Sequence, residues 1–310
     1  MHFMTNGEVT SSSIDETSST NGGNITWKDI KSLIKIGIVN SNLFTVFAGY
    51  WLALYFTGVS FMPNIKVFFL TMVGSTLVLI GASILNNWYD ADVDQAMERT
   101  RERPTVTGKL SSNNALLLGI TSTIIGLILL YTTTITAAIV AFIGWFTYVV
   151  LYTMWSKRRY TLNTEIGCIS GAVPPLIGWA AINPDLFHIV PITLFLIMFI
   201  WQTPHFLALA IKNCNQYKAA GIPMLPVVHG FEFTKRQIVV YIACLLPLPF
   251  FLYELGATFL IIATLLNIVW LIIGFRGLFI DDVMKWANQV FFYSLGYLVI
   301  IFLTMIVTVV

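Results

Sequence analysis

Residues 110–156 read LSSNNALLLGITSTIIGLILLYTTTITAAIVAFIGWFTYVVLYTMWS, a stretch without a single charged side chain. An α-helix needs about 20 apolar residues to cross the roughly 30 Å hydrocarbon layer of a bilayer. This stretch is more than twice that long, and three consecutive threonines interrupt it at residues 132–134. We therefore predict two membrane-spanning helices here, joined by a short turn at the threonines.

Further charge-free windows lie on both sides of this stretch. Each is near or above the length of one span, and they cover residues 36–65, 67–89, 166–184, 186–211, 237–253, 255–275 and 286–310. One helix for each window and two for residues 110–156 give nine. The sequence thus predicts an all-α polytopic membrane protein with nine transmembrane helices.

The composition supports a membrane protein and excludes other classes. Of the 310 residues, 57% are hydrophobic and only 10% are charged, and the net charge is +2. A soluble domain has about a quarter of its residues charged. A nucleic-acid-binding protein needs a strong basic patch, which so small and scattered a charge does not provide. We therefore exclude a nucleic-acid partner and expect membrane lipid around the protein.

The basic residues predict the orientation of the chain. Cytoplasmic loops of membrane proteins are enriched in Lys and Arg. With nine spans and a cytoplasmic N-terminus, every Lys and Arg except Lys66 falls on the cytoplasmic side. The predicted topology is therefore N-in and C-out. The long polar loops at residues 90–113 and 213–235 then lie at the cytoplasmic face of the cell membrane, where we expect the active site.

The ends of the chain and the cysteines add little chemistry. Residues 1–24 are rich in Ser, Thr, Gly and Asn, which predicts a disordered polar tail before one transmembrane domain at residues 25–310. Cys168, Cys214 and Cys244 have no CxxC spacing. We expect neither a disulfide framework nor a zinc site.

Asn86, Asp90 and Asp94 are spaced at i, i+4 and i+8 at the end of the second predicted span. Four residues of an α-helix rotate by only about 40° beyond a full turn, so the three side chains share one stripe. Carboxylates at this spacing repel each other, and a divalent cation between them removes that cost. Oxygen ligands that leave coordination positions open are typical of Mg²⁺ held jointly with a substrate phosphate. The stripe predicts a magnesium site.

The basic residues after the stripe allow two interpretations. In the first, Arg99, Arg101 and Arg103 only pair with the carboxylates at a solvated helix end. In the second, arginines beside a metal bind a diphosphate. The second is favoured because the stripe emerges from an apolar helix, where ionisable groups are costly unless they are functional. In a lipid-embedded protein without a P-loop or GxGxxG motif, the diphosphate is expected to carry an isoprenyl tail.

These residues resemble the intramembrane prenyltransferases, and more narrowly the members that farnesylate heme. The resemblance runs from about Lys31 to the C-terminus. It is carried by four segments: Asn86-x₃-Asp90-x₃-Asp94 with Arg99-Thr100 and Arg103-Pro104, the run YTMWSKR at residues 152–158, the run GAVPPLIGW at residues 171–179, and Pro204-His205-Phe206 leading to the run GIPMLPVV at residues 221–228.

The resemblance implies a Mg²⁺-dependent transfer of farnesyl from farnesyl diphosphate to the 2-vinyl group of heme B, giving heme O. Heme B is then a substrate, Mg²⁺ is the cofactor, and heme A synthase is a possible further partner. The resemblance implies that Asn86, Asp90 and Asp94 hold the metal. It assigns the diphosphate oxygens to three basic residues, Arg99, Arg103 and Lys157. It assigns substrate contacts to a second group: Asn87, Tyr152, His205, Tyr217 and Lys218.

The assignment of His205 and the number of metal ions both stay open. A lone histidine in an apolar helix is as often a hydrogen-bonded structural residue as a heme contact, so both interpretations of His205 stay open. The family usually has two acidic residues just before Tyr217, whereas this chain has Asn215 and Gln216. Amides bring no charge to a metal, which puts a second carboxylate-held ion in doubt.

Three other functions remain as alternatives. A related prenyltransferase would act on a quinone precursor. A transporter would need ionisable groups near the bilayer midplane and often an inverted repeat, but here the acids cluster near one face. A heme-binding electron carrier would need paired axial ligands, and His205 has no second histidine within its predicted span.

Overall fold

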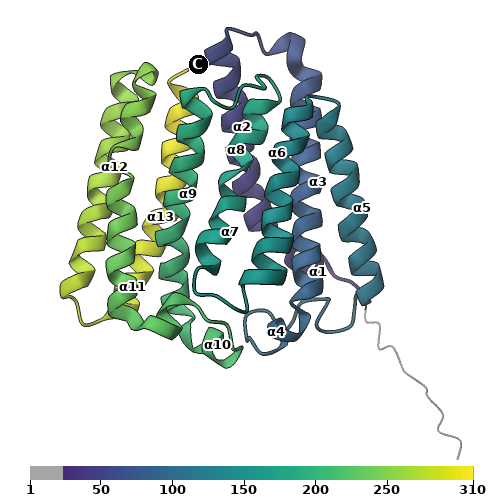
Figure 1. Ribbon diagram of the computed structural model, residues 1–310, viewed down its shortest axis with the longest axis vertical. Helices are drawn as coiled ribbons and strands as arrows, with labels where there is room; N and C mark the ends of the chain where they lie inside the picture. The colour runs from purple at the N-terminus through teal and green to yellow at the C-terminus, as the bar shows by residue number, and fades with distance from the viewer. Residues whose placement is uncertain (1–23, 310) are drawn as a thin grey trace, which may run out of the picture.

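The structure, a computed structural model, describes residues 24–309, which contain helices and connecting turns but no β-strand. Long helices stand side by side in one bundle (Figure 1). The predicted all-α class is therefore confirmed for the described chain. The tail predicted at residues 1–24 lies outside the described residues apart from Asn24.

The helices follow one another along the chain with short connections. In chain order, the first half contains α1 (Trp27–Ile34), α2 (Ile36–Thr57), η1 (Met62–Asn64), α3 (Ile65–Tyr89), α4 (Ala91–Gln95), α5 (Ser112–Tyr131), α6 (Ile135–Phe146) and the π-helix η2 (Thr147–Ser156). The second half contains α7 (Asn163–Ala172), α8 (Pro174–Ala180), α9 (Ile189–Lys212), α10 (Cys214–Ala219), α11 (Leu225–Cys244), η3 (Leu248–Leu255), α12 (Gly256–Arg276), η4 (Gly277–Phe279) and α13 (Val283–Val307).

Seven helical segments of the described chain are long and apolar enough to cross a membrane. One of them, Leu225–Phe279, contains both α11 and α12. The helix predicted over residues 166–184 is divided into α7 and α8 at Pro174, because proline lacks a backbone donor and interrupts a helix. The predicted break at the threonines is confirmed, and the hydroxyl of Thr134 caps α6 by accepting from the N–H of Ala137 at 3.0 Å.

The polar connections gather at one end of the bundle. The short helices α4 and α10 lie at this end, and the C-terminus lies at the other (Figure 1). Helix α1 is fixed by Asp29, whose carboxylate accepts from Lys109 Nζ at 2.8 Å. The hydrogen bond from Lys109 lowers the pKa of Asp29 to about 2. Asn87 of α3 also donates to the carbonyl of Leu33 at 2.8 Å.

Two glycines let α2 and α8 approach each other closely. A β-carbon at Gly49 would overlap the carbonyl of Pro175, and one at Gly178 would overlap the carbonyl of Val46. Small residues are the usual means of close helix packing in membranes, where dispersion contacts replace the hydrophobic effect between helices. Because α8 also packs on α6 and α9, this contact holds the middle of the bundle together.

We predict that Gly178→Ala destabilises the folded protein by about 1–3 kcal/mol, the usual cost of forcing a methyl group into a packed interface. The midpoint of thermal unfolding in detergent should fall by several degrees. Gly296→Ala is the matched control, because a β-carbon at Gly296 meets nothing within 4 Å. Equal unfolding midpoints for the two variants would contradict the close α2–α8 contact.

Candidate functional site

The predicted acidic stripe forms at the junction of α3 and α4. Helix α3 ends at Tyr89, and Asp90 links it to α4. The helical hydrogen-bond pattern continues through this link: the N–H of Asp90 donates to the carbonyl of Asn86 at 2.9 Å, and that of Asp94 to the carbonyl of Asp90 at 2.8 Å. The three side chains are thus kept in one row although the helix is interrupted.

The carboxylates of the stripe pair with basic residues, and Asp90 has a second, longer ion pair with Arg158 Nη2 at 3.6 Å. Asp90 is fully buried and accepts from Lys157 Nζ at 2.5 Å, and Asp94 accepts from Arg103 Nη1. The Asn86 amide donates to Asp90 at 2.9 Å and to the Thr153 hydroxyl at 2.8 Å. The pairing interpretation is therefore correct for Arg103. These ion pairs do not exclude an anion-binding site, because basic side chains outnumber acidic ones in the cluster.

Lys35 belongs to this cluster and was missed by the sequence analysis. It connects α1 to α2 in the left-handed conformation, with φ 53°, which non-glycine residues rarely adopt. Its ammonium group donates to Asn86 Oδ1 and, at 3.2 Å, to the hydroxyl of Tyr148. Burial lowers the pKa of Lys35 well below its usual range, and Arg103 and Lys157 act in the same direction. An anionic ligand would counter that effect.

A π-helix shapes the opposite wall. In η2 the Thr153 hydroxyl donates to the carbonyl of Tyr148, and the N–H of Lys157 donates to the carbonyl of Tyr152, each five residues back. The wider turn stacks the Tyr148 and Tyr152 rings with centroids 5.6 Å apart and brings Lys157 to Asp90. Single turns of π-helix often occur at functional sites.

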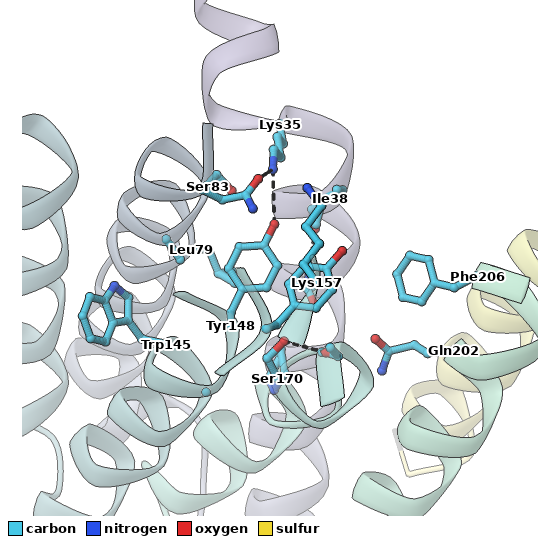
Figure 2. A pocket seen from close by; sticks show the side chains of 18 of the residues that line it. Lys35, Ile38, Leu79, Ser83, Trp145, Tyr148, Lys157, Ser170, Gln202 and Phe206 are labelled. Carbon is cyan, nitrogen blue, oxygen red and sulfur yellow. Dashed lines mark hydrogen bonds between the residues drawn. The ribbon is translucent and has the colours of Figure 1, made fainter. Parts of the chain in front are cut away.

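A cavity of about 280 Å³ starts at this charged cluster and continues between apolar helices. Figure 2 shows Lys35, Tyr148 and Lys157 around one end, with Leu79 and Trp145 on one side and Phe206 and Gln202 on the other. Its charged end is lined by Lys35, Asn86, Asp94, Arg99, Arg103 and Lys157, and its apolar part by residues such as Val78, Leu79, Ala82, Ala141, Val173 and Ile177. The cavity thus joins a mainly cationic end to an apolar shaft.

Most of the predicted site residues meet at this cavity. The lining includes Asn86, Asp94, Arg99, Arg103, Lys157, Tyr152 and Tyr217; Asp90 does not line the cavity but accepts a hydrogen bond from Asn86. Asn87, His205 and Lys218 do not line it. Asn87 instead holds α1 in place, and Lys218 is exposed.

His205 faces α13 rather than the cavity. Its ring stacks between Trp201, at 5.2 Å, and Phe291, at 4.8 Å between centroids, and its Nδ1 lies 2.7 Å from the Ser294 hydroxyl. These contacts match the structural interpretation of this histidine. The neighbouring residues Gln202 and Phe206 line the cavity instead, and the sequence pattern gave no signal that separated them from His205.

The side-chain oxygens of Asn86, Asp90 and Asp94 suit a hard divalent cation that also binds a ligand. Within residues 24–309 no three His, Cys, Asp or Glu side chains form a metal-binding group. Asn86 is nevertheless hydrogen-bonded to Asp90, and Asp94 follows one turn later. The buried Oδ1 of Asp90 has no hydrogen-bond partner, although Arg158 Nη2 lies 3.6 Å from it. Two carboxylates and an amide leave coordination positions open, which suits Mg²⁺ better than a closed protein cage would.

The long apolar helices indicate a polytopic membrane protein, with a cavity that joins a charged end to an apolar part. The family model described as "UbiA prenyltransferase family" matches residues 42–296. The chain belongs to this family, and it is a prenyltransferase.

Named relatives and a solved structure agree with this assignment. A Geobacillus sp. (strain WCH70) protein named "Protoheme IX farnesyltransferase" is 60% identical over 281 residues, covering 91% of each chain. One of the same name from Oceanobacillus iheyensis is 63% identical, covering 90% of this chain and 89% of its own. The solved UbiA homolog from Archaeoglobus fulgidus bound to GPP and Mg²⁺ has a TM-score of 0.62 at 16% identity, covering 89% and 99%.

We predict that Lys157→Met destabilises the protein by about 3 kcal/mol, because it leaves the buried Asp90 carboxylate without its ammonium partner. Adding Asp90→Asn should recover part of that loss, because the uncompensated charge is then removed. Chemical denaturation in detergent measures both. Lys218→Met is the control, since Lys218 is exposed and its replacement should change the free energy of unfolding by less than about 0.5 kcal/mol. Equal stability of Lys157→Met and this control would refute the pairing.

Proposed function

We propose that this enzyme transfers the farnesyl group of farnesyl diphosphate to the 2-vinyl group of heme B and so makes heme O. The observation that carries the proposal is the cavity, whose cationic end suits a diphosphate and whose apolar shaft suits a prenyl tail. The choice of heme as the acceptor is supported by the names of relatives that are about 60% identical over most of the chain.

In this proposal the charged end binds the diphosphate. Asn86, Asp90 and Asp94 hold Mg²⁺. When bound, the metal supplies positive charge to the diphosphate oxygens as the leaving group departs. The basic side chains at the same end bind those oxygens directly, and they are Lys35, Arg99, Arg103 and Lys157.

The charge balance of the cluster favours an anionic ligand. Four basic side chains, those of Lys35, Arg103, Lys157 and Arg158, face three carboxylates, those of Asp90, Asp92 and Asp94. Lys35 forms no ion pair among the described residues and is held by an amide and a phenol instead. A diphosphate that enters with Mg²⁺ supplies the missing negative charge. Preorganised cations of this kind act where charge grows on the leaving group.

The walls next to the charged end suit a reaction that passes through an allylic cation. The stacked rings of Tyr148 and Tyr152 line the cavity there, and aromatic faces attract positive charge. The apolar helices below them keep bulk water away from the cation. Tyr217 completes the lining from the α10 side. We assign no role in the transfer to His205, which packs on α13, to Asn87, which holds α1, or to the exposed Lys218.

The proposed topology has nine spans. It counts α11 and α12 separately and treats the interrupted pair α7–α8 as one crossing. The N-terminus is cytoplasmic, the C-terminus is outside, and the charged end lies at the cytoplasmic face of the cell membrane. This is supported by the distribution of basic residues and by the position of α4 and α10 opposite the C-terminus. Heme A synthase is the proposed consumer of the product.

We predict that membranes containing the enzyme convert heme B and farnesyl diphosphate to heme O only with Mg²⁺, as measured by mass spectrometry of extracted heme. Asp94→Asn should lower the rate about a hundredfold or more, because it removes a carboxylate that would hold Mg²⁺ at the diphosphate. Asp92→Asn is the matched control: Asp92 is on the same short helix, exposed and paired with Arg158.

Several outcomes would reject the proposal. Full turnover in EDTA would exclude the metal role, and equal losses in the two Asp variants would exclude a special role for Asp94. Unmodified heme together with a prenylated quinone precursor would identify the related prenyltransferase. Uptake of substrate into vesicles without chemical change would identify a transporter.

A further inference from the structure

The cavity has an uncharged polar side chain on its α9 wall. Gln202 lies inside the apolar helix α9, lines the cavity and is only 5% exposed. A polar group in a membrane-spanning helix is costly unless its hydrogen bonds are made, and such residues are usually functional. The charged end described above does not involve this residue.

Contacts fix which atom of the Gln202 amide is available. Its Nε2 donates to the carbonyl of Met198 at 2.9 Å and to that of Cys168 at 3.4 Å. The amide nitrogen is therefore committed, and Oε1 points the other way. Oε1 lies against the backbone of Gly171, where a β-carbon would overlap it. Within residues 24–309 no donor is hydrogen-bonded to Oε1.

Gln202 Oε1 lies close to the charged end of the cavity. Gly167 lies one turn before Gly171 on α7, and a β-carbon there would be 3.2 Å from the Tyr152 ring. Tyr152 stacks on Tyr148, which is bonded to Lys35. Gln202 is thus about one helical turn below the tyrosine layer. Figure 2 shows its amide extending from α9 toward the Ser170 side of the cavity.

Ser170, on the neighbouring helix α7, supplies a second acceptor at the cavity. Its hydroxyl donates to the carbonyl of Gly167 at 2.7 Å, so its hydroxyl hydrogen is used while its oxygen lone pairs remain. Ser170 also lines the cavity. A water molecule needs acceptors for its two hydrogens if its oxygen is to be presented to an electrophile. Gln202 Oε1 and Ser170 Oγ are two such acceptors among the residues that line the cavity.

We propose that Gln202 is a positioning residue for the water that ends the farnesyl transfer, an inference that rests on the proposed function. The C1–oxygen bond of farnesyl diphosphate breaks and its electron pair leaves with the diphosphate, and the π electrons of the vinyl group then form a carbon–carbon bond to C1 of the allylic cation. The positive charge is then on the vinyl carbon next to the porphyrin. The water oxygen bonds to this carbon and gives its extra proton to the released diphosphate, with no oxidation or reduction.

Without a positioned water, the same cation loses a proton instead of adding water. It loses a proton from the adjacent carbon to the diphosphate and gives an alkene that is lighter than heme O by one water. The ratio of alkene to alcohol therefore reports on the water and is independent of how much enzyme is folded. We predict that Gln202→Met raises this ratio about fivefold to tenfold, the value of one hydrogen bond.

A second variant acts on the same oxygen from the other side. Gly171→Ala displaces Oε1 without changing Gln202 and should raise the ratio in the same direction. Gly144→Ala is the matched control, because it also adds a methyl group to a helix that lines the cavity, but against Val173. Its product ratio should stay at the wild-type value whatever its effect on the rate.

The products of purified enzyme in detergent, with heme B, farnesyl diphosphate and Mg²⁺, are resolved by liquid chromatography and mass spectrometry. A higher alkene ratio in Gln202→Met and Gly171→Ala, but not in Gly144→Ala, supports the inference. A wild-type ratio in Gln202→Met, even with a slower rate, overturns it while leaving the proposed function intact. Unmodified heme with the wild-type enzyme overturns the proposed function itself, and the inference with it.

Discussion

The ionic cluster formed by Asp90 and Asp94 with Lys157, Arg103 and Lys35 is the constraint on which the rest of the site depends. Charged groups removed from water are tolerated only when paired and hydrogen-bonded. Pairing here requires the end of α3, the start of α4, the π-helix η2 and the α1–α2 junction to meet at one point. Because these elements meet there, an excess of basic side chains lies at the charged end of an otherwise apolar cavity. Such an arrangement suits an anion with a hydrocarbon tail.

Much of the fold could be predicted from the distribution of charge along the chain. The absence of charged residues located the long helices, and the threonines at residues 132–134 marked a real turn. The division of α7 from α8 and the close α2–α8 contact were not predicted. The division follows from Pro174 inside the predicted helix. The contact depends on the partner helix, because Gly49 and Gly178 permit it only where Pro175 and Val46 lie opposite them.

The site was predicted where its residues share a helix and missed where they come together from several. Asn86, Asp90 and Asp94 follow from helical spacing, and Lys157 followed from the family resemblance. Lys35 was not found, because its role depends on a left-handed backbone and on distant partners in α3 and η2. On α9, spacing could not decide which residues face inward: His205 packs on α13, whereas Gln202 and Phe206 line the cavity.

Calorimetric binding of farnesyl thiodiphosphate, a slowly reacting substrate analogue, tests the central claim most directly. The account predicts that Mg²⁺ tightens binding to the wild-type enzyme by about tenfold or more, equal to roughly 1.4 kcal/mol, and that Asp94→Asn loses this gain. Equal affinity in EDTA and in Mg²⁺, with Asp94→Asn indistinguishable from wild type, would contradict the assignment of the acidic stripe to a metal-held diphosphate.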